Sequence, residues 1–311
     1  MSAGDIGGAA DQAYGAFVLV AGLLLLGLVA DADGLFGWAS AKLLGVTRAP
    51  GRLLVVALAL VAAVTAVLNL DTAVVFLTPI LIGAARGAGV DEQPFLYGSV
   101  LMANASSLER WGAGGGIRRA DAPPPGAPRV RPLGAAACAL AAALVLALPA
   151  PGLPVLGIAL VATAVRVRDG TLGMRAAAEA VGPAALVGLF ALSVALGTLG
   201  RAWSGPADLL GSASPAQTCA VAALAAILMN NLPAAVLLSA QPPPHPRALL
   251  LGLNAGPNLA VTGSLSAYLW WRAARGCGAR PSARRFSALG APLAVAAMAA
   301  GLGTIALIGP S

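Results

Sequence analysis

Small polar side chains interrupt long apolar runs at four places in this chain. Amide and hydroxyl groups donate and accept hydrogen bonds without carrying a fixed charge. In apolar surroundings each of them costs free energy unless a partner satisfies it. Together such groups could hold a small oxyanion, a neutral hydroxy compound or a coupling cation. The four places are, in chain order, Asn69 to Asp71, Asn104 to Ser107, Asn230-Asn231 and Asn258 to Ser264.

The composition predicts that these apolar runs lie in a membrane. Of the 311 residues, 59% are hydrophobic and 10% are charged, and the mean hydropathy is +0.85. A soluble domain carries about 25% charged residues, so this chain could not cover its own surface with them. We therefore expect an all-α polytopic membrane protein.

The net charge of +7 would also suit a nucleic-acid partner, but its distribution argues against one. The basic residues are confined to short clusters between apolar runs, at 42–52, 110–131, 166–175 and 272–285. Such clusters are typical of cytoplasmic loops, and we expect their arginines to contact lipid headgroups. The predicted location is the plasma membrane with the basic loops in the cytoplasm, and no nucleic acid is expected as a partner.

Hydropathy and breaker residues divide the chain into elements. The amphipathic segment 35–46 is too short to span a bilayer and is expected to lie along the membrane interface. In the first part we expect a span at 14–30, this interfacial helix, a broken run at 53–85, a broken helix at 94–108 and a loop at 109–131. In the second part we expect spans at 133–148, 155–165 and 181–199, a broken run at 215–240, a broken helix at 245–271 and a last span at 286–308.

The two broken runs are predicted to be re-entrant hairpins. If all basic clusters are cytoplasmic, the runs 53–85 and 215–240 must each leave the membrane on the side they entered, and on opposite sides. Each hairpin is followed by a broken helix, which predicts two inverted repeats, 1–131 and 132–311. Inverted repeats whose discontinuous helices meet at the bilayer midplane are typical of secondary transporters.

The polar residues at the four breaks are the candidate substrate- or ion-binding residues. Free amides at the start of a half-helix suit an anion, and free carbonyls at the end of one suit a cation. Asp71 is the one carboxylate inside a predicted intramembrane break, where a proton or cation site is expected. The alternative interpretation is interhelical hydrogen bonding or kinking, but four breaks in matched order favour binding. The candidates are Asn69, Asp71, Thr72, Asn104, Ser106, Ser107, Asn230, Asn231, Asn258, Thr262 and Ser264.

Other chemistry has little support in the sequence. Cys138, Cys219 and Cys277 are far apart, and His245 is the single histidine. Neither a metal constellation nor a disulfide framework follows from this spacing. No nucleophile–base pair is visible, so we expect neither an enzyme nor a bound cofactor.

At the breaks the sequence resembles the ion transporter superfamily, and most closely its arsenite/antimonite efflux permeases. The matching pieces are "NLDTAVVFLTP", "LMANASSL", "LMNNLPAAVLL" and "GLNAGPNLAVTGSL". The resemblance implies export of a trivalent metalloid hydroxide, driven by the membrane potential or a proton gradient, with an associated ATPase or a second copy as a partner. The same superfamily includes citrate, dicarboxylate and sodium/proton carriers, which stay open as alternatives, with a proton or sodium as the coupling ion.

Departures from the family pattern motivate a second hypothesis. Asp71 matches the family's aspartate, but Leu70 stands where an asparagine is expected. Beyond Leu108 a segment rich in Gly, Pro and Arg replaces the second half of the broken helix, and we also expect one or two leading spans to be lacking. The chain could therefore be a shortened, transport-inactive paralogue.

Overall fold

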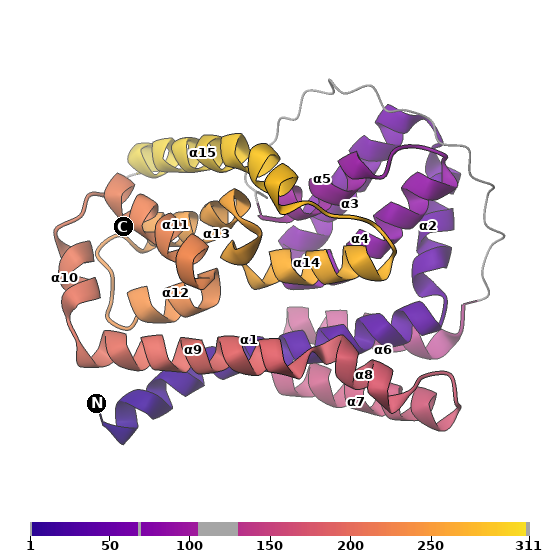
Figure 1. The fold of residues 1–311 in the computed structure, drawn as a ribbon, viewed down its shortest axis with the longest axis horizontal. Coiled ribbons are helices and arrows are strands. Elements are labelled where there is room, and N and C mark those ends of the chain that lie inside the picture. Colours follow the sequence, from indigo (N-terminus) through magenta and orange to yellow (C-terminus); the bar gives the residue numbers. More distant parts are fainter. Residues whose placement is uncertain (1, 68–69, 105–129, 309–311) are drawn as a thin grey trace.

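The computed structural model describes residues 2–67, 70–104 and 130–308, and the regular elements in these ranges are helices (Figure 1). Within these described ranges, three helical stretches are long and apolar enough to cross a membrane: Ala3–Ala32, Met174–Ala202 and Ala283–Leu307. The prediction of an all-α polytopic membrane protein is therefore confirmed.

The first helix, α1 (Ala3–Ala32), contains the predicted span 14–30 but begins well before it. A capping box starts it early, because Ser2 Oγ accepts from the Asp5 N–H at 3.2 Å and the Asp5 carboxylate accepts from the Ser2 N–H at 2.7 Å. Gly34, at φ 77°, turns the chain into α2 (Leu35–Val46), whose bounds match the prediction. Figure 1 shows α2 turning away from the axis of α1.

The predicted hairpin 53–85 is a pair of helices, α3 (Pro50–Val67) and α4 (Leu70–Gly87). They are followed by α5 (Gln93–Asn104). The α2 helix packs on α4, where Ser40 Oγ donates to the Ile80 carbonyl at 2.8 Å. Gly83 permits this close approach, since a Cβ there would lie 2.6 Å from Ser40 Oγ. One face of α2 is thus buried against protein, and its placement at a membrane interface stays a prediction.

The middle of the chain forms a helical pair and a long bent helix. The predicted spans 133–148 and 155–165 are α6 (Pro132–Ala147) and α7 (Gly152–Arg168), which pack against each other and against α1. The predicted span 181–199 lies within α8 (Met174–Val181) and α9 (Pro183–Ala202), which Gly182 separates at φ 61°. A short helix, α10 (Gly205–Gly211), was not predicted from the sequence.

The last part of the chain contains both predicted breaks of the second repeat. The run 215–240 is α11 (Pro215–Met229) and α12 (Asn231–Leu238). The broken helix 245–271 consists of α13 (Pro246–Ala255), two 3₁₀ turns, η1 (Gly256–Leu259) and η2 (Val261–Gly263), and α14 (Leu265–Gly276). The last span is α15 (Ala283–Ile308).

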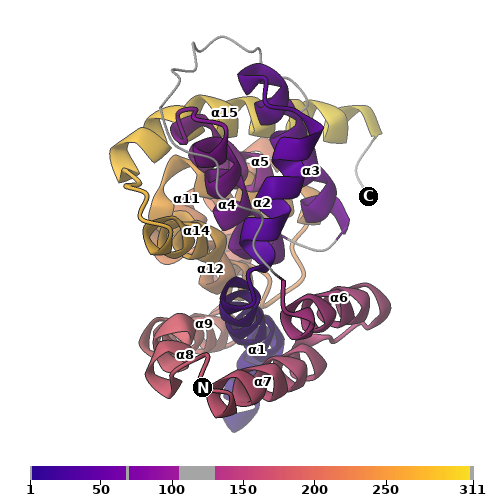
Figure 2. The ribbon, with the colours of Figure 1, turned by 90° about the vertical axis from the view of Figure 1, so that its right-hand side faces the viewer.

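Arginine side chains bond to backbone carbonyls of neighbouring helices at two opposite ends of the molecule. At one, called the basic end here, Arg86 of α4 donates to the Cys277 carbonyl after α14 at 2.5 Å, and Arg272 of α14 donates to the Glu179 carbonyl of α8. Figure 2 looks onto this end, with α2 in front. At the other, called the Arg201 end, Arg201 of α9 donates to the Gly8 carbonyl of α1 at 3.1 Å. The two-repeat organisation itself stays a prediction.

Candidate functional site

The tip of the second hairpin is a single residue in an unusual backbone conformation. Asn230 joins α11 to α12 with φ 75° and ψ 148°, a region that residues other than glycine rarely adopt. Its side-chain oxygen accepts from the Leu232 N–H at 3.3 Å and so caps α12. Its Nδ2 donates to the Thr262 carbonyl at 3.2 Å. Asn230 therefore ties the hairpin tip to the break between α13 and α14.

That break is a buried stretch of unwound backbone. Asn258 in η1 and Ser264 after η2 are both 0% exposed. Ser264 Oγ caps α14 by accepting from the Ala267 N–H at 3.0 Å. Gly290 of α15 crosses directly over η1, where any Cβ would overlap the Asn258 carbonyl. The lack of a side chain at Gly290 is thus what lets α15 cover the break.

The contact between the two breaks links the cap of α12 to the backbone just before α14. Asn230 caps α12, and it contacts Thr262, which lies two residues before the cap of α14. Helix N-termini carry partial positive charge and bind anions. Asn231 Oδ1 is buried next to them without a hydrogen-bond partner in the described part of the chain, so it offers an acceptor to a donor or a cation.

The hydrogen bonds that hold this arrangement are made with uncharged groups. Asn230 bonds to backbone atoms of Leu232 and Thr262, and Thr262 Oγ1 donates to the Ile227 carbonyl at 3.5 Å. Ser264 Oγ accepts from Ser266 Oγ at 3.0 Å. These contacts position the two N-termini by neutral hydrogen bonds, so they offer dipoles rather than a formal charge to a ligand.

The first-repeat candidates are only partly described. Asp71 and Thr72 lie in the first turn of α4, and Asn104 is the last residue of α5. Their side chains, together with the whole of Asn69, Ser106 and Ser107, lie outside the described part of the structure. The binding role predicted for these six residues is therefore untested by the geometry.

The end of α5 nevertheless reaches the second break. A Cβ built on Gly290 would lie 3.2 Å from Leu101 Cδ2, and it would also overlap the Asn258 carbonyl. Nearer the start of α5, the Leu96 carbonyl accepts from Nε1 of the buried Trp270 of α14 at 2.8 Å. The α5 helix is thus packed against the broken helix that follows the second hairpin.

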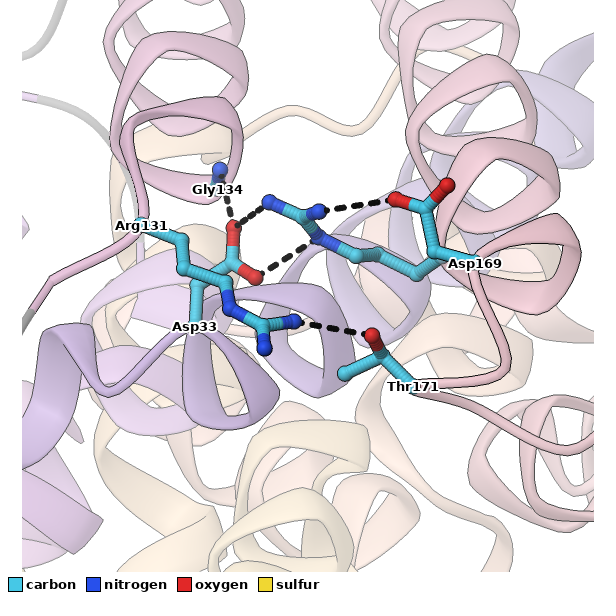
Figure 3. Close-up of polar contacts among 6 residues, drawn as sticks. Asp33, Arg131, Gly134, Asp169 and Thr171 are labelled. Atoms are coloured by element: carbon cyan, nitrogen blue, oxygen red, sulfur yellow. Dashed lines mark hydrogen bonds and ion pairs between the residues drawn. The ribbon is translucent and has the colours of Figure 1, made fainter.

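One buried polar cluster was missed from the sequence (Figure 3). The Asp33 carboxylate, at the end of α1, lies 2.7 Å from Arg166 Nε and accepts from Arg166 Nη2 at 2.9 Å and from the Gly134 N–H at 2.6 Å. Arg166 also contacts Asp169 at 3.2 Å. The expectation that the arginines of this cluster contact lipid headgroups is wrong for Arg166, because its guanidinium is buried against Asp33. The pair holds α6 and α7 on α1, away from the breaks.

Among the described residues, no group of three or more His, Cys, Asp or Glu side chains is placed to hold a metal ion. The cysteines Cys138, Cys219 and Cys277 are free thiols.

Comparison with known proteins gives one match. A protein-family model described as "Citrate transporter" matches residues 5–114, which is about a third of the chain. The matched range contains all but the first two residues of α1, and α2 to α5, and so it covers the predicted first hairpin and the segment predicted as a broken helix. No curated protein matches the chain, and no solved structure does. The match supports a permease of the ion-transporter type and says nothing specific about arsenite.

Proposed function

We propose that this protein is a secondary permease that moves a small anion, or its neutral hydroxy form, across the plasma membrane with the basic loops in the cytoplasm. The observation that carries the proposal is the 3.2 Å contact between Asn230, which caps α12, and the Thr262 carbonyl, two residues before the cap of α14. Half-helix N-termini pointing at an anionic group are the usual substrate clamp of such carriers. The strained backbone at Asn230 adds support, because strain persists mainly at functional positions.

Citrate or a related dicarboxylate is the first candidate substrate class, because the matching family model is described as a citrate transporter. Carboxylate groups suit helix N-termini. The neutral contacts around Asn230 and Ser264 leave most of a polyanion's charge to be balanced by coupling ions. Protons or sodium bound near Asp71 and the free Asn231 oxygen would supply that balance.

Arsenite or antimonite is the second candidate. A trivalent metalloid hydroxide is uncharged near neutral pH, so it needs hydrogen bonds rather than a compensating cation. The uncharged surroundings of Asn230, Thr262 and Ser264 fit such a solute, and the resemblance to efflux permeases at "MNNLP" and "GPNLAVTGSL" supports it.

The test is flux into proteoliposomes with imposed proton, sodium and potential gradients. We expect gradient-driven uptake of radiolabelled citrate, a dicarboxylate, arsenite or antimonite, and loss of uptake in Asn231→Ala and Asp71→Asn. The matched control is Ser193→Ala, which removes a buried hydroxyl that donates to the Leu189 carbonyl of its own helix. A folded protein that moves none of these solutes would overturn the proposal in favour of a transport-inactive paralogue.

A further inference from the structure

The last helix, α15, is bent, and the bend lies next to its crossing over the second break. Figures 1 and 2 both show the first segment of α15 at an angle to the rest of the helix. Pro292 lies inside α15 and has no N–H to donate to the Ala288 carbonyl, which kinks a helix. Two residues before Pro292, Gly290 crosses so close to η1 that a Cβ would overlap the Asn258 carbonyl. The bend therefore lies within one helical turn of the crossing.

The first segment of α15 is held by α5 and α14. At its start, Tyr97 Oη of α5 accepts from the Ser282 N–H at 2.9 Å. One turn farther on, the fully buried rings of Phe286 and Trp270 of α14 have centroids 5.5 Å apart. This segment is thus fixed to α14, the half-helix that follows the break.

The second segment of α15 packs instead on α13, the half-helix that precedes the break. A Cβ on Gly301 would lie 2.6 Å from Leu251 Cδ2 of α13. The break itself is also held from the other side, since a Cβ on Gly256 of η1 would lie 2.6 Å from Ala223 Cα of α11. The η1 turn is therefore enclosed between α11 and α15.

The direct connection between α13 and α14 is two short 3₁₀ turns, a type of connection that commonly marks a hinge. Such a connection does not fix the angle between the helices it joins, whereas α15 is a helix that contacts both. We infer that α15 bridges the break, with the bend at Pro292 setting the angle between α13 and α14. Gly290 and Pro292 are then positioning residues for the polar groups of the break. Their effect on transport rests on the proposed function, but the bridge itself does not.

Distances between two pairs of spin labels test the bridge. One pair, Leu250→Cys with Leu307→Cys, joins α13 to the end of α15. The other pair, Arg275→Cys with Arg284→Cys, joins α14 to the start of α15. All four residues are exposed, and electron paramagnetic resonance gives both distances. The background is Cys138→Ser/Cys277→Ser, and Cys219 is kept because it is 1% exposed.

Straightening α15 should move one pair and not the other. A proline kink turns a helix by about 20° or more, and Leu307 lies roughly 22 Å beyond Pro292 along the helix. In Pro292→Ala the distance from α13 to the end of α15 should therefore change by roughly 8 Å, while the distance from α14 to its start stays the same. The matched control Gly303→Ala, with nothing within 4 Å of its Cβ, should change neither distance.

If Pro292→Ala does not fold, Gly290→Ala tests the same bridge, because its Cβ pushes α15 away from the Asn258 carbonyl. A change in the same pair of labels supports the bridge. An unchanged distance from α13 to the end of α15 in the folded variants overturns it, whether or not the protein transports. A change in the α14 pair as well overturns the fixed first segment.

Uptake of radiolabelled citrate and arsenite into proteoliposomes tests the positioning role. Loss of one hydrogen bond to the solute weakens its binding by about tenfold, so KM should rise by about that factor in Pro292→Ala and Gly290→Ala but not in Gly303→Ala. A merely destabilised protein would lose maximal rate at an unchanged KM. An unchanged KM beside a changed label distance therefore overturns the positioning role. Changed distances in a protein that takes up neither solute support the bridge and overturn the proposed function.

Discussion

Replacing Asn230 by glycine and by alanine should separate the backbone strain of the hairpin tip from its hydrogen bonds. At φ 75° and ψ 148° a residue other than glycine stores about 1–3 kcal/mol of strain. The side chain offsets part of that cost with its bond to the Leu232 N–H and its bond to the Thr262 carbonyl. A cap of this kind is worth about 1 kcal/mol, and a further hydrogen bond contributes about 1 kcal/mol.

Alanine keeps the strain and loses both bonds, so Asn230→Ala should be about 2 kcal/mol less stable than the natural protein. Glycine loses the bond to Thr262 but adopts this backbone freely, and as a cap it costs only a few tenths of a kcal/mol relative to asparagine. Asn230→Gly should therefore be close to the natural protein in stability, and about 2 kcal/mol or more above Asn230→Ala.

The assay is thermal unfolding of the purified variants in detergent, followed by uptake in proteoliposomes. The matched control is the same pair of changes at Leu224, an exposed residue in the interior of α11. There glycine should be about 1 kcal/mol less stable than alanine, so the order of the two variants reverses between the positions. Uptake should be lost in both Asn230 variants, because both lack the carboxamide.

Equal stability of the two Asn230 variants, or a more stable alanine variant, would refute the strained tip. Full uptake by the stable Asn230→Gly variant would refute the binding role of the carboxamide and leave Asn230 with a structural role only.

Three further predictions follow from contacts outside the tip. Arg166→Met leaves the buried Asp33 carboxylate unpaired and should lower the free energy of unfolding by about 3–5 kcal/mol, whereas the double variant Asp33→Leu/Arg166→Met should recover most of that loss. A double-mutant cycle of thermal unfolding measures the coupling between the two residues. Additive effects of the two changes would contradict the pairing. Gly290→Ala should lower the free energy of unfolding by about 1–3 kcal/mol, because its Cβ would overlap the Asn258 carbonyl. The control Gly303→Ala, in the same helix with nothing within 4 Å of its Cβ, should be neutral or stabilising by about 0.5–1 kcal/mol. Equal stability losses at the two positions would refute the close crossing of α15 over η1. Burial, with a smaller contribution from the nearby Asp31 carboxylate, raises the pKa of the Cys277 thiol. Maleimide labelling of Cys277 should therefore be slower at pH 7 than labelling of a cysteine peptide, and its rate should rise with pH over a higher pH range than the rate for the peptide. A labelling rate equal to the peptide's at pH 7 would contradict the raised pKa.

The linear pattern of hydropathy predicted most helices within a few residues. The helix predicted at 35–46 has the observed bounds, and the break at Asn230 lies where polar residues interrupt an apolar run. The helix start at Ala3 and the short α10 were missed, because a capping box and a Ser-Gly-Pro sequence act through local hydrogen bonds and backbone restriction that a hydropathy average does not register.

The site was predicted as a set of residue types rather than as a geometry. Asn230 and Thr262 were both candidates, but their contact depends on how far η2 unwinds and on the fold of α11 against it.

The sequence by itself determined that this is a helical membrane protein with polar breaks, because transfer free energies and helix breakers act on short stretches of chain. Only the tertiary structure decided which polar groups meet. Asp33 and Arg166 are 133 residues apart, and Gly290 is conspicuous only where α15 crosses the Asn258 carbonyl. Such contacts depend on the packing of helices whose relative positions no local pattern specifies, and it is this packing that places Asn230, the cap of α12, against the Thr262 carbonyl ahead of α14.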